Sequence, residues 1–328
     1  MAESFDMRGV DGVVVQKPAE VVALKPNEVR VKITHTGVCG TDLFYVQYGC
    51  ALGHEGVGII EEVGSAVKLH KVGDRVGGGY LRSSCGSCTY CLTGRDILCY
   101  SRDCYGMASF SNGTFGTYYI GTESYVYPIP ESLPSEFAAP LQCAGATVYA
   151  ALKAYSRPGL RVGVLGIGGL GHLAIQFAAK SGAETVVFST SASKEEEARG
   201  FGASEFVILG HEDQLTKPVD VLLITAAKSP EWTTFMSEKV VARGAQIVVL
   251  GAIAETLELP FSSLFFNCYN VVTNLVASRA THGEMLNFAA AHNIKPVIEE
   301  FELNEAGVAD AISKLKSGKL RYRAVLHV

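Results

Sequence analysis

The 328-residue chain lacks a basic excess, a long uninterrupted hydrophobic run, internal repeats and low-complexity tracts. Its 28 basic and 33 acidic residues give a net charge of −5. This balance disfavours nucleic acid or an anionic membrane as the main partner, because both attract a basic face. The longest weakly apolar stretch, 137–155, is interrupted by Pro140, Gln142 and Lys153. It therefore predicts a core helix and not a membrane span.

The N-terminal segment also lacks the pattern of an export signal, since no basic stretch is followed by an apolar run. We therefore expect a cytoplasmic protein, in which the nine cysteines stay reduced and are available to metals. The composition, 48% hydrophobic and 19% charged, is that of a well-packed globular protein. The length allows two domains of ordinary size.

Four cysteines stand close together in the pattern C-x2-C-x2-C-x7-C: Cys85, Cys88, Cys91 and Cys99. Zinc takes four ligands in a tetrahedron, and such short spacings let one loop surround one ion. Chance clustering and a pair of disulfides are the alternatives, and the expected reducing environment argues against disulfides. We predict a structural zinc site. With no open coordination position it performs no chemistry, so the function lies in other residues.

The chain changes character near residue 147. The first third is rich in turns and predicts short strands at 29–34, 56–63 and 118–120. After residue 147, apolar runs alternate with helix-length segments, at 161–165, 185–188, 220–225, 246–250 and 271–276. This alternation predicts an α/β architecture with a doubly wound parallel sheet. Helical patterns at 284–291 and 305–317 and a last strand at 322–328 form a tail, whose packing the pattern leaves open.

A glycine-rich turn follows the first of these apolar runs and precedes an apolar helical stretch at 170–180. Its residues, Gly166, Gly168, Gly169, Leu170 and Gly171, fit the pattern G-x-G-x-x-G. In such turns glycine allows a tight bend and close approach of a pyrophosphate, which the helix N-terminus attracts. The strand–turn–helix context predicts a dinucleotide site, although a turn used only for packing has the same pattern.

No carboxylate follows the second strand, where NAD enzymes place the acidic residue that binds the ribose hydroxyls. Hydroxyls and an ammonium group stand there instead: Ser189, Thr190, Ser191 and Lys194. Charge-assisted hydrogen bonds from such groups can hold a 2′-phosphate. We therefore predict NADP(H) as the cofactor. In the alternative reading, Ser191 or Ser193 only caps a helix that begins near Lys194.

Three further metal ligands are available outside the four-cysteine loop, namely Cys39, His54 and Cys143. A catalytic zinc keeps three protein ligands and leaves one position open. Spacing alone does not single these residues out, because they are far apart in sequence. A lone cysteine or histidine among glycines is more often a packing residue.

Ordered motifs run through nearly the whole chain: P-N-E-V at 26–29, G-V-C-G-T-D at 37–42, G-H-E-G at 53–56, V-G-D-R-V at 72–76, the four-cysteine loop, A-A-P-L-x-C-A-G-x-T at 138–147 and the glycine turn. With these motifs the sequence resembles the zinc-dependent medium-chain dehydrogenases, most closely the cinnamyl-alcohol-dehydrogenase-like branch. The resemblance implies a GroES-like catalytic domain at 1–147 and 280–328, with the tail returning to it. It implies a Rossmann NADP-binding domain at 148–279.

The resemblance also assigns roles to individual residues. It makes Cys39, His54 and Cys143 the ligands of a catalytic zinc, the set known from alcohol dehydrogenase. Glu55 matches the family carboxylate beside the ligand histidine, which binds zinc or supports its ligands. Thr41 matches the hydroxyl that passes a proton to the product, unless a turn alone accounts for it. Two zinc ions per chain and a homodimer are further implications.

The expected reaction is NADPH-dependent reduction of an aldehyde, or oxidation of a primary alcohol in reverse. Two departures from the family bear on the substrate: Phe44 occupies the position where a histidine commonly continues the proton relay, and the segment between Cys39 and His54 is short. Three aromatic residues are candidates for the pocket wall or for core packing: Tyr45, Tyr48 and Phe115.

Two other functions remain open at this point. On the same scaffold, an NADPH-dependent reductase could act on an activated C=C bond or an iminium, and Phe44 would then matter less. A non-enzymatic NADPH-binding protein is the remaining class. This class includes a zinc-ribbon interaction protein, although the residues around the four cysteines are mainly neutral and do not favour nucleic acid. The partner that we expect is a small-molecule aldehyde or alcohol, with no role for nucleic acid or membrane.

Overall fold

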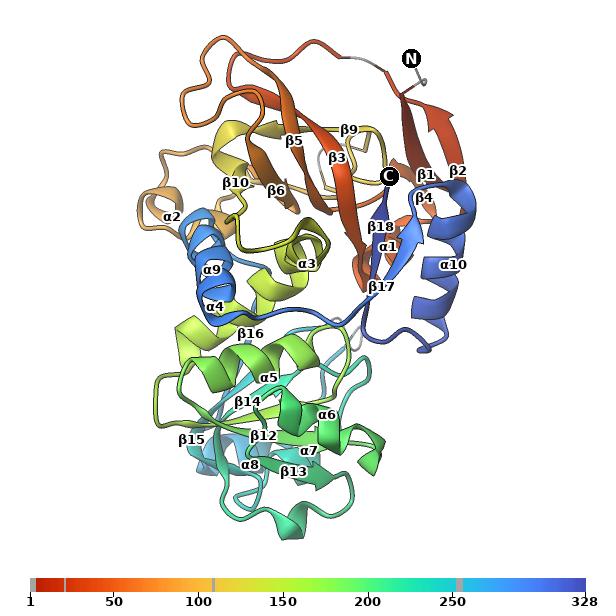
Figure 1. Ribbon diagram of the computed structural model, residues 1–328. Helices are drawn as coiled ribbons and strands as arrows, with labels where there is room; N and C mark the ends of the chain where they lie inside the picture. The colour runs from red at the N-terminus through yellow and green to blue at the C-terminus, as the bar shows by residue number, and fades with distance from the viewer. Residues whose placement is uncertain (1–3, 21, 108–109, 252–255) are drawn as a thin grey trace. The chain divides into compact units, whose positions relative to one another are not determined.

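The computed structural model describes residues 4–20, 22–107, 110–251 and 256–328 (Figure 1). The chain forms two compact units. The first unit comprises Met1–Ala146 and Val276–Val328, and the second unit comprises Thr147–Leu275. The C-terminal tail thus belongs to the same unit as the N-terminal third.

A seven-stranded sheet organises the described part of the first unit, with the order β10-β6-β5-β3-β18-β17 and β9 paired to β3. Its strands are β3 (Glu28–Val38), β5 (Glu55–Val63), β6 (Arg75–Gly79), β9 (Tyr118–Thr122), β10 (Val126–Pro128), β17 (Ile298–Glu302) and β18 (Arg323–His327). Strand β18 pairs antiparallel with β3 through Ala324 and Val38. The tail of the chain thus contributes β17 and β18 to the sheet of the first unit.

Smaller elements complete the first unit. A three-stranded sheet has the order β2-β1-β4, with β1 (Phe5–Val10), β2 (Val13–Pro18) and β4 (Tyr48–Ala51), and β7 (Leu81–Ser83) pairs with β8 (Asp103–Cys104). The helices are α1 (Gly40–Tyr45), α2 (Thr89–Leu92), α3 (Ser135–Pro140), α9 (Arg279–His292) and α10 (Glu305–Lys316). Alternating residues of β3, such as Val29, Val31 and Ile33, are buried in the core of this unit.

The stretch 137–155, which we expected to form one core helix, is helical in three consecutive pieces. Helix α3 ends at Pro140, a π-helical turn spans Leu141–Gly145, and α4 spans Ala146–Tyr155. A proline has no backbone N–H, and π-helical turns often mark functional sites. The π-helical turn contains Cys143.

The second unit is built on a six-stranded, fully parallel sheet with the order β13-β12-β11-β14-β15-β16. Its strands are β11 (Arg161–Leu165), β12 (Glu184–Ser189), β13 (Glu205–Ile208), β14 (Val219–Ile224), β15 (Val241–Val249) and β16 (Asn270–Thr273). Its remaining helices are α5 (Gly171–Lys180), α6 (Glu195–Gly200), α7 (Trp232–Phe235) and α8 (Phe261–Phe266). All five residues of β11 are buried, as expected for a central parallel strand. The predicted Rossmann-type sheet is confirmed, and its strand order reverses between β11 and β14, where ligands bind in such folds.

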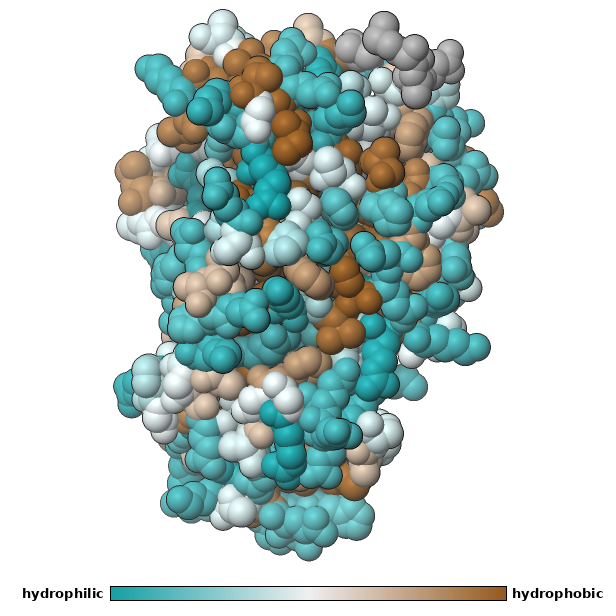
Figure 2. Space-filling view, viewed as in Figure 1, coloured by the Kyte–Doolittle hydropathy of each residue, from teal (hydrophilic) through white to brown (hydrophobic). Residues whose placement is uncertain are grey.

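The face in Figure 2 is largely hydrophilic, with hydrophobic side chains scattered among polar ones. In the described parts of the chain, no helix has both the length and the apolar character needed to cross a membrane.

Candidate metal centres and cofactor site

A cluster of possible metal ligands lies in the first unit. Cys39 is the residue before α1, His54 precedes β5, Glu55 begins β5, and Cys143 belongs to the π-helical turn. One ligand atom from each of these four residues lies within 4.8 Å of those of the others. Residues far apart in sequence are therefore brought together at one point.

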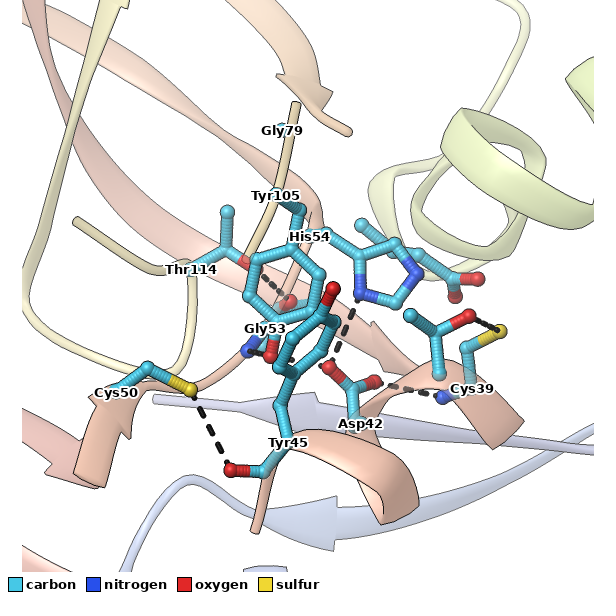
Figure 3. A network of polar contacts seen from close by, with 12 residues as sticks. Cys39, Asp42, Tyr45, Cys50, Gly53, His54, Gly79, Tyr105 and Thr114 are labelled. Atoms are coloured by element: carbon cyan, nitrogen blue, oxygen red, sulfur yellow. Dashed lines mark hydrogen bonds and ion pairs between the residues drawn. The ribbon is translucent and has the colours of Figure 1, made fainter. Parts of the chain in front are cut away.

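The His54 ring fits the role of a metal ligand. Its Nδ1 lies 3.0 Å from Oδ1 of Asp42, and both side chains are fully buried (Figure 3). Its other nitrogen, Nε2, is buried and has no hydrogen-bond partner among the described residues. An orphaned buried nitrogen is costly unless something binds it. Together with the sulfur atoms of Cys39 and Cys143, it forms a donor set that suits zinc.

Asp42 is the hub of this site (Figure 3). Its Oδ2 accepts a 2.9 Å hydrogen bond from the backbone N–H of Cys39, and its Oδ1 accepts one of 3.3 Å from Gly53. The Tyr105 ring stacks on His54 with centroids 4.6 Å apart, and its hydroxyl accepts the Gly53 N–H at 3.1 Å. The His54 ring is thus held by the contact of its Nδ1 with Asp42 and by stacking on the Tyr105 ring.

Neighbouring charges and burial shift the pKa values of two of the candidate ligands, His54 and Cys39. Burial lowers the pKa of His54, but Asp42 and Cys39 outweigh it and raise this pKa to about 10. A hydrogen bond from Cys143 lowers the pKa of Cys39 well below its usual range. A metal ion binding here must therefore displace a proton from His54, while a thiolate is favoured at Cys39.

Glu55 is paired with a residue from the far end of the chain. Arg323, on β18, donates from Nη2 to both carboxylate oxygens of Glu55, and both side chains are buried. Burial raises the pKa of Glu55, and Arg323 limits that rise, leaving it at about 7. Arg323 could not be predicted in this role from the sequence, because only the pairing of β18 with β3 brings it close to Glu55.

Thr41 lies in the first turn of α1, with its hydroxyl 3.8 Å from the Cys39 sulfur. Phe44 follows one turn later and is exposed. Of the aromatic residues considered for a pocket, Phe115 is buried in the core of the first unit and Tyr45 packs against that core. Tyr48 is exposed and its ring lies 5.1 Å from that of Phe44. Core packing therefore accounts for Phe115.

The four-cysteine loop has the geometry of a zinc site. Sulfur–sulfur distances are 3.9 Å for Cys85 and Cys91, 3.5 Å for Cys88 and Cys91, and 3.6 Å for Cys99 and Cys85. A tetrahedron with Zn–S bonds of about 2.3 Å places the sulfur atoms about 3.8 Å apart. All four thiols are free, and a disulfide would need about 2.05 Å. The donor set therefore fits zinc and not paired disulfides.

This loop is anchored to the C-terminal part of the chain. The buried Asp96 carboxylate accepts hydrogen bonds of 3.2 and 3.3 Å from the backbone N–H of Arg279, the first residue of α9. The Arg279 guanidinium lies 3.5 Å from the same carboxylate and over the ring of Tyr125. A negative charge at a helix N-terminus is favourable, so Asp96 ties the loop to α9.

The predicted glycine turn lies between β11 and α5. Gly166 has φ +96°, which favours glycine, and a Cβ on Gly171 would lie 1.9 Å from the Gly166 carbonyl oxygen. A Cβ on Gly168 would meet nothing within 4 Å, so the backbone there is open to a ligand. Gly169 and Leu170 complete the turn, and Leu170 directly precedes α5. The turn is shaped for a pyrophosphate at the N-terminus of α5.

The four residues predicted to bind the 2′-phosphate differ in burial and in their contacts. Ser189 is buried at the end of β12, whereas Thr190 and Ser191 are exposed. The Ser191 and Ser193 hydroxyls lie 2.9 Å apart, and Ser191 makes no capping hydrogen bond. Ser191 thus stands at the N-cap position of the turn Ala192–Lys194 without capping it through its side chain. Lys194 donates a 2.9 Å hydrogen bond to the carbonyl of Ile167 in the glycine turn, so its ammonium lies at the turn.

A cavity of about 370 Å³ lies at the carboxyl ends of the parallel strands, lined by residues that include Thr190 and Lys228. Sequence reasoning missed Lys228, a cation that lines the same cavity as the predicted phosphate-binding residue Thr190. The cavity also contains Glu212 and Glu231. Glu212 accepts the backbone N–H of Gly210, and Glu231 accepts the N–H groups at the start of α7. Both carboxylates are thus already engaged.

A β-rich unit with a Cys–His–Cys cluster and a parallel sheet with a glycine turn together define the class of zinc-site dehydrogenases. The family described as alcohol dehydrogenase GroES-like domain matches residues 25–131, and that described as zinc-binding dehydrogenase matches residues 169–291. The chain belongs to the zinc-dependent medium-chain dehydrogenases, in the branch of the cinnamyl alcohol dehydrogenases.

Relatives and solved structures agree with this placement. An alcohol dehydrogenase of Geobacillus stearothermophilus is 34% identical over 327 residues, 95% of each chain. Cinnamyl alcohol dehydrogenase 8 of Arabidopsis thaliana is 33% identical over 346 residues, 99% of this chain and 95% of the relative. The cinnamyl alcohol dehydrogenase SbCAD4 of Sorghum bicolor superposes with a TM-score of 0.91 at 31% identity, covering 99% of this chain and 97% of its own.

A second similar solved structure contains a cofactor. It is the cinnamyl alcohol dehydrogenase of Helicobacter pylori complexed with NADP(H), with a TM-score of 0.87 and 27% identity. The superposition covers 99% of this chain and 98% of that one.

Proposed function

We propose that this chain is a zinc-dependent, NADP(H)-linked alcohol dehydrogenase that reduces aldehydes and oxidises primary alcohols. The observation that carries the proposal is the orphaned, buried Nε2 of His54 beside the sulfur atoms of Cys39 and Cys143. This arrangement stands in a chain that also has a dinucleotide-shaped glycine turn. Structural zinc at the four-cysteine loop is part of the same proposal.

Each group of the site has its own task. Bound zinc supplies Lewis-acid polarisation of a carbonyl, and NADPH supplies hydride. Cys39, His54 and Cys143 hold the metal, and Asp42 fixes the orientation of the His54 ring. The Thr41 hydroxyl, beside Cys39, donates the proton that completes the alcohol. Glu55 is held by Arg323 at the edge of this donor set.

The proton-transfer role of Thr41 can be tested by replacing it with valine, which keeps the shape and removes the hydroxyl. The T41V variant should lose at least about 100-fold in kcat, the usual contribution of a proton-transfer group. NADPH binding, followed by its fluorescence, and zinc content should stay unchanged. Unchanged turnover would remove Thr41 from the proton path.

The NADP(H) preference is supported by three observations. No carboxylate occurs among Ser189, Thr190, Ser191 and Lys194, two of these hydroxyls are exposed, and the Helicobacter pylori relative is complexed with NADP(H). Initial rates of NADPH and NADH oxidation on a panel of aldehydes test the preference. A T190D variant, which puts a carboxylate on the cavity wall, should shift the preference toward NADH. A wild-type enzyme that prefers NADH would overturn the proposal.

Conjugated enals decide between the proposed carbonyl reduction and the reduction of an activated C=C bond. Product analysis separates the unsaturated alcohol from the saturated aldehyde. We expect the alcohol. A saturated aldehyde as the main product would favour the other reaction and would explain why Phe44 can replace a histidine in the relay position.

A further inference from the structure

The π-helical turn that carries Cys143 is tied to α3 by the side chain of its neighbour, Gln142. This side chain is buried, and its Nε2 donates a 2.9 Å hydrogen bond to the carbonyl of Ala138, four residues earlier. The turn itself is wider than an α-helix, since the Ala146 N–H reaches the carbonyl of Leu141, five residues back. Gln142 therefore links the wide turn to the last turn of the regular helix before it.

The other end of the Gln142 amide contacts α9. A backbone carbonyl only accepts, so Nε2 faces Ala138 and Oε1 faces Nε2 of His282, at 2.9 Å. Burial lowers the pKa of His282 to about 3, so the ring is neutral near pH 7 and carries its one proton on Nε2, which donates. The ring also stacks on Tyr127 in β10, with centroids 3.9 Å apart. Both polar atoms of the Gln142 side chain are therefore engaged.

The surroundings leave room for this amide and hold its partner. A Cβ on Gly77, in β6, would lie 2.7 Å from Cδ and Nε2 of Gln142, so a larger residue there would displace the amide. Three residues before His282, the first N–H of α9 is bound by the buried carboxylate of Asp96. The Gln142 amide is thus a rigid link between α9 and the π-helical turn.

A rigid link has a purpose here, because metal ligands have to be held within about 0.5 Å of their working positions. Asp42 does this for Cys39, through its N–H, and for His54, through its ring. Cys143 lies on a different element, at the residue after Gln142.

We propose that Gln142 and His282 are positioning residues, which fix the turn of Cys143 and so place the third ligand of the catalytic metal. The inference rests on the proposed function, because that function assigns Cys143 to the metal. Neither side chain touches the substrate in this role. Their effect reaches the reaction only through the Cys143 sulfur.

Release of zinc to a chelator gives the first test. Q142M keeps the length of the side chain and removes both of its hydrogen bonds. H282F keeps a ring on Tyr127 without the donor, whereas H282Q restores a donor. Zinc should leave the site about 10-fold faster in Q142M and H282F, the lower end for residues that support ligands, and at a rate nearer the wild type in H282Q. C143S, which lacks the ligand, identifies the zinc that belongs to this site.

The spectrum of cobalt(II) in place of zinc gives a second test, because its visible bands depend on ligand geometry. The four-cysteine site contributes equally in every variant, so difference spectra isolate the catalytic ion. Q142M and H282F should shift the bands, and H282Q should retain them. The matched control is V29A, at a buried residue at the end of β3 opposite to Cys39, which should lower the urea midpoint and leave the bands unchanged.

Three results would overturn the positioning role: wild-type zinc release in Q142M, equal behaviour of H282F and H282Q, or a band shift in V29A as large as that in Q142M. The last would show that general loosening of the unit is the cause. Neither readout needs a substrate. A wild type that binds cobalt at Cys143 but reduces no aldehyde would therefore refute the proposed function alone, and one that binds no metal there would refute both.

Discussion

At the scale of single residues, Asp42 shows how one carboxylate organises a metal site. Its carboxylate accepts hydrogen bonds from the backbone N–H groups of Cys39 and Gly53 and lies beside the His54 ring nitrogen Nδ1. A carboxylate in this position fixes the tautomer of a ligand histidine and raises its basicity.

D42N should therefore weaken zinc at the Cys39–His54–Cys143 cluster. The amide keeps the volume of Asp42 but loses the charge that supports the His54 ring. We expect a loss of about 10- to 100-fold in zinc affinity or in activity, as for other partners of ligand histidines. Zinc retained during titration with a chelator measures the effect. D213N, at an exposed residue of the second unit, is the control, and equal zinc retention by both variants would contradict the prediction.

The burial of His282 leads to a prediction about how the free energy of unfolding depends on pH. It is buried on α9, accepts or donates a 2.9 Å hydrogen bond with Gln142, and stacks on Tyr127. Burial lowers the pKa of His282 to about 3, while an unfolded histidine has about 6.5. Between these values the unfolded chain binds the extra proton. This contribution to stability is complete above pH 6.5 and falls with decreasing pH, by up to about 1.4 kcal/mol per pH unit.

Urea unfolding between pH 7.5 and 5 tests this expectation. The H282Q variant keeps a hydrogen-bonding group and removes the titration, so its stability should fall less steeply on acidification than that of the wild type. H211Q, at an exposed histidine, should follow the wild type, and acid release of zinc is common to all three proteins. Parallel curves for H282Q and the wild type would refute the assignment.

At the scale of elements, the sequence predicted those parts whose signal is local. The run 161–165 coincides with β11, and 170–180 contains α5, because a central parallel strand is apolar throughout and a glycine turn marks the helix start. The four-cysteine loop was found for the same reason. Strand β13 was missed, because it is a short edge strand that begins with Glu205.

The Cys39–His54–Cys143 cluster needed the resemblance, since three separate elements contribute to it and no spacing links them. Arg323 was not found even with the resemblance, because it reaches Glu55 only through the pairing of β18 with β3. Contacts created by long-range packing leave no local pattern in a sequence.

The four-cysteine loop leads to a prediction about zinc content and thermal stability. C99S removes one buried ligand of the four-cysteine site and should release one of the two zinc ions expected from the two ligand groups. Because the metal holds a loop that carries Asp96 to α9, the melting temperature should fall by roughly 5–10 °C. Elemental analysis and thermal unfolding measure both effects. C268S, at an exposed cysteine outside both groups, should retain all of its zinc, and a C99S protein with unchanged zinc would disprove the site.

At the scale of the whole molecule, the second unit has an exposed hydrophobic patch on α8. Three phenylalanines of α8 are exposed, Phe261 at 70%, Phe265 at 62% and Phe266 at 78%. Phe261 stacks on Phe265, with ring centroids 5.7 Å apart. In the described residues, the neighbouring β16 is the last strand of the parallel sheet and pairs only with β15, so one edge is open. Clustered aromatics beside an open edge favour association with another chain.

The homodimer that the resemblance implied gives this surface a partner, because a twofold axis would bring the same patch of each copy together. Replacing Phe265 with serine should then shift the protein from dimer to monomer in sedimentation velocity, without unfolding the parallel sheet. L69S, at an equally exposed leucine of the first unit, should leave the dimer intact. Since neither residue belongs to a ligand group, zinc content should be the same in both variants, so that assembly and the metal sites are tested separately. A wild type that sediments as a monomer, or an F265S variant that remains a dimer, would show that α8 faces something other than a second copy.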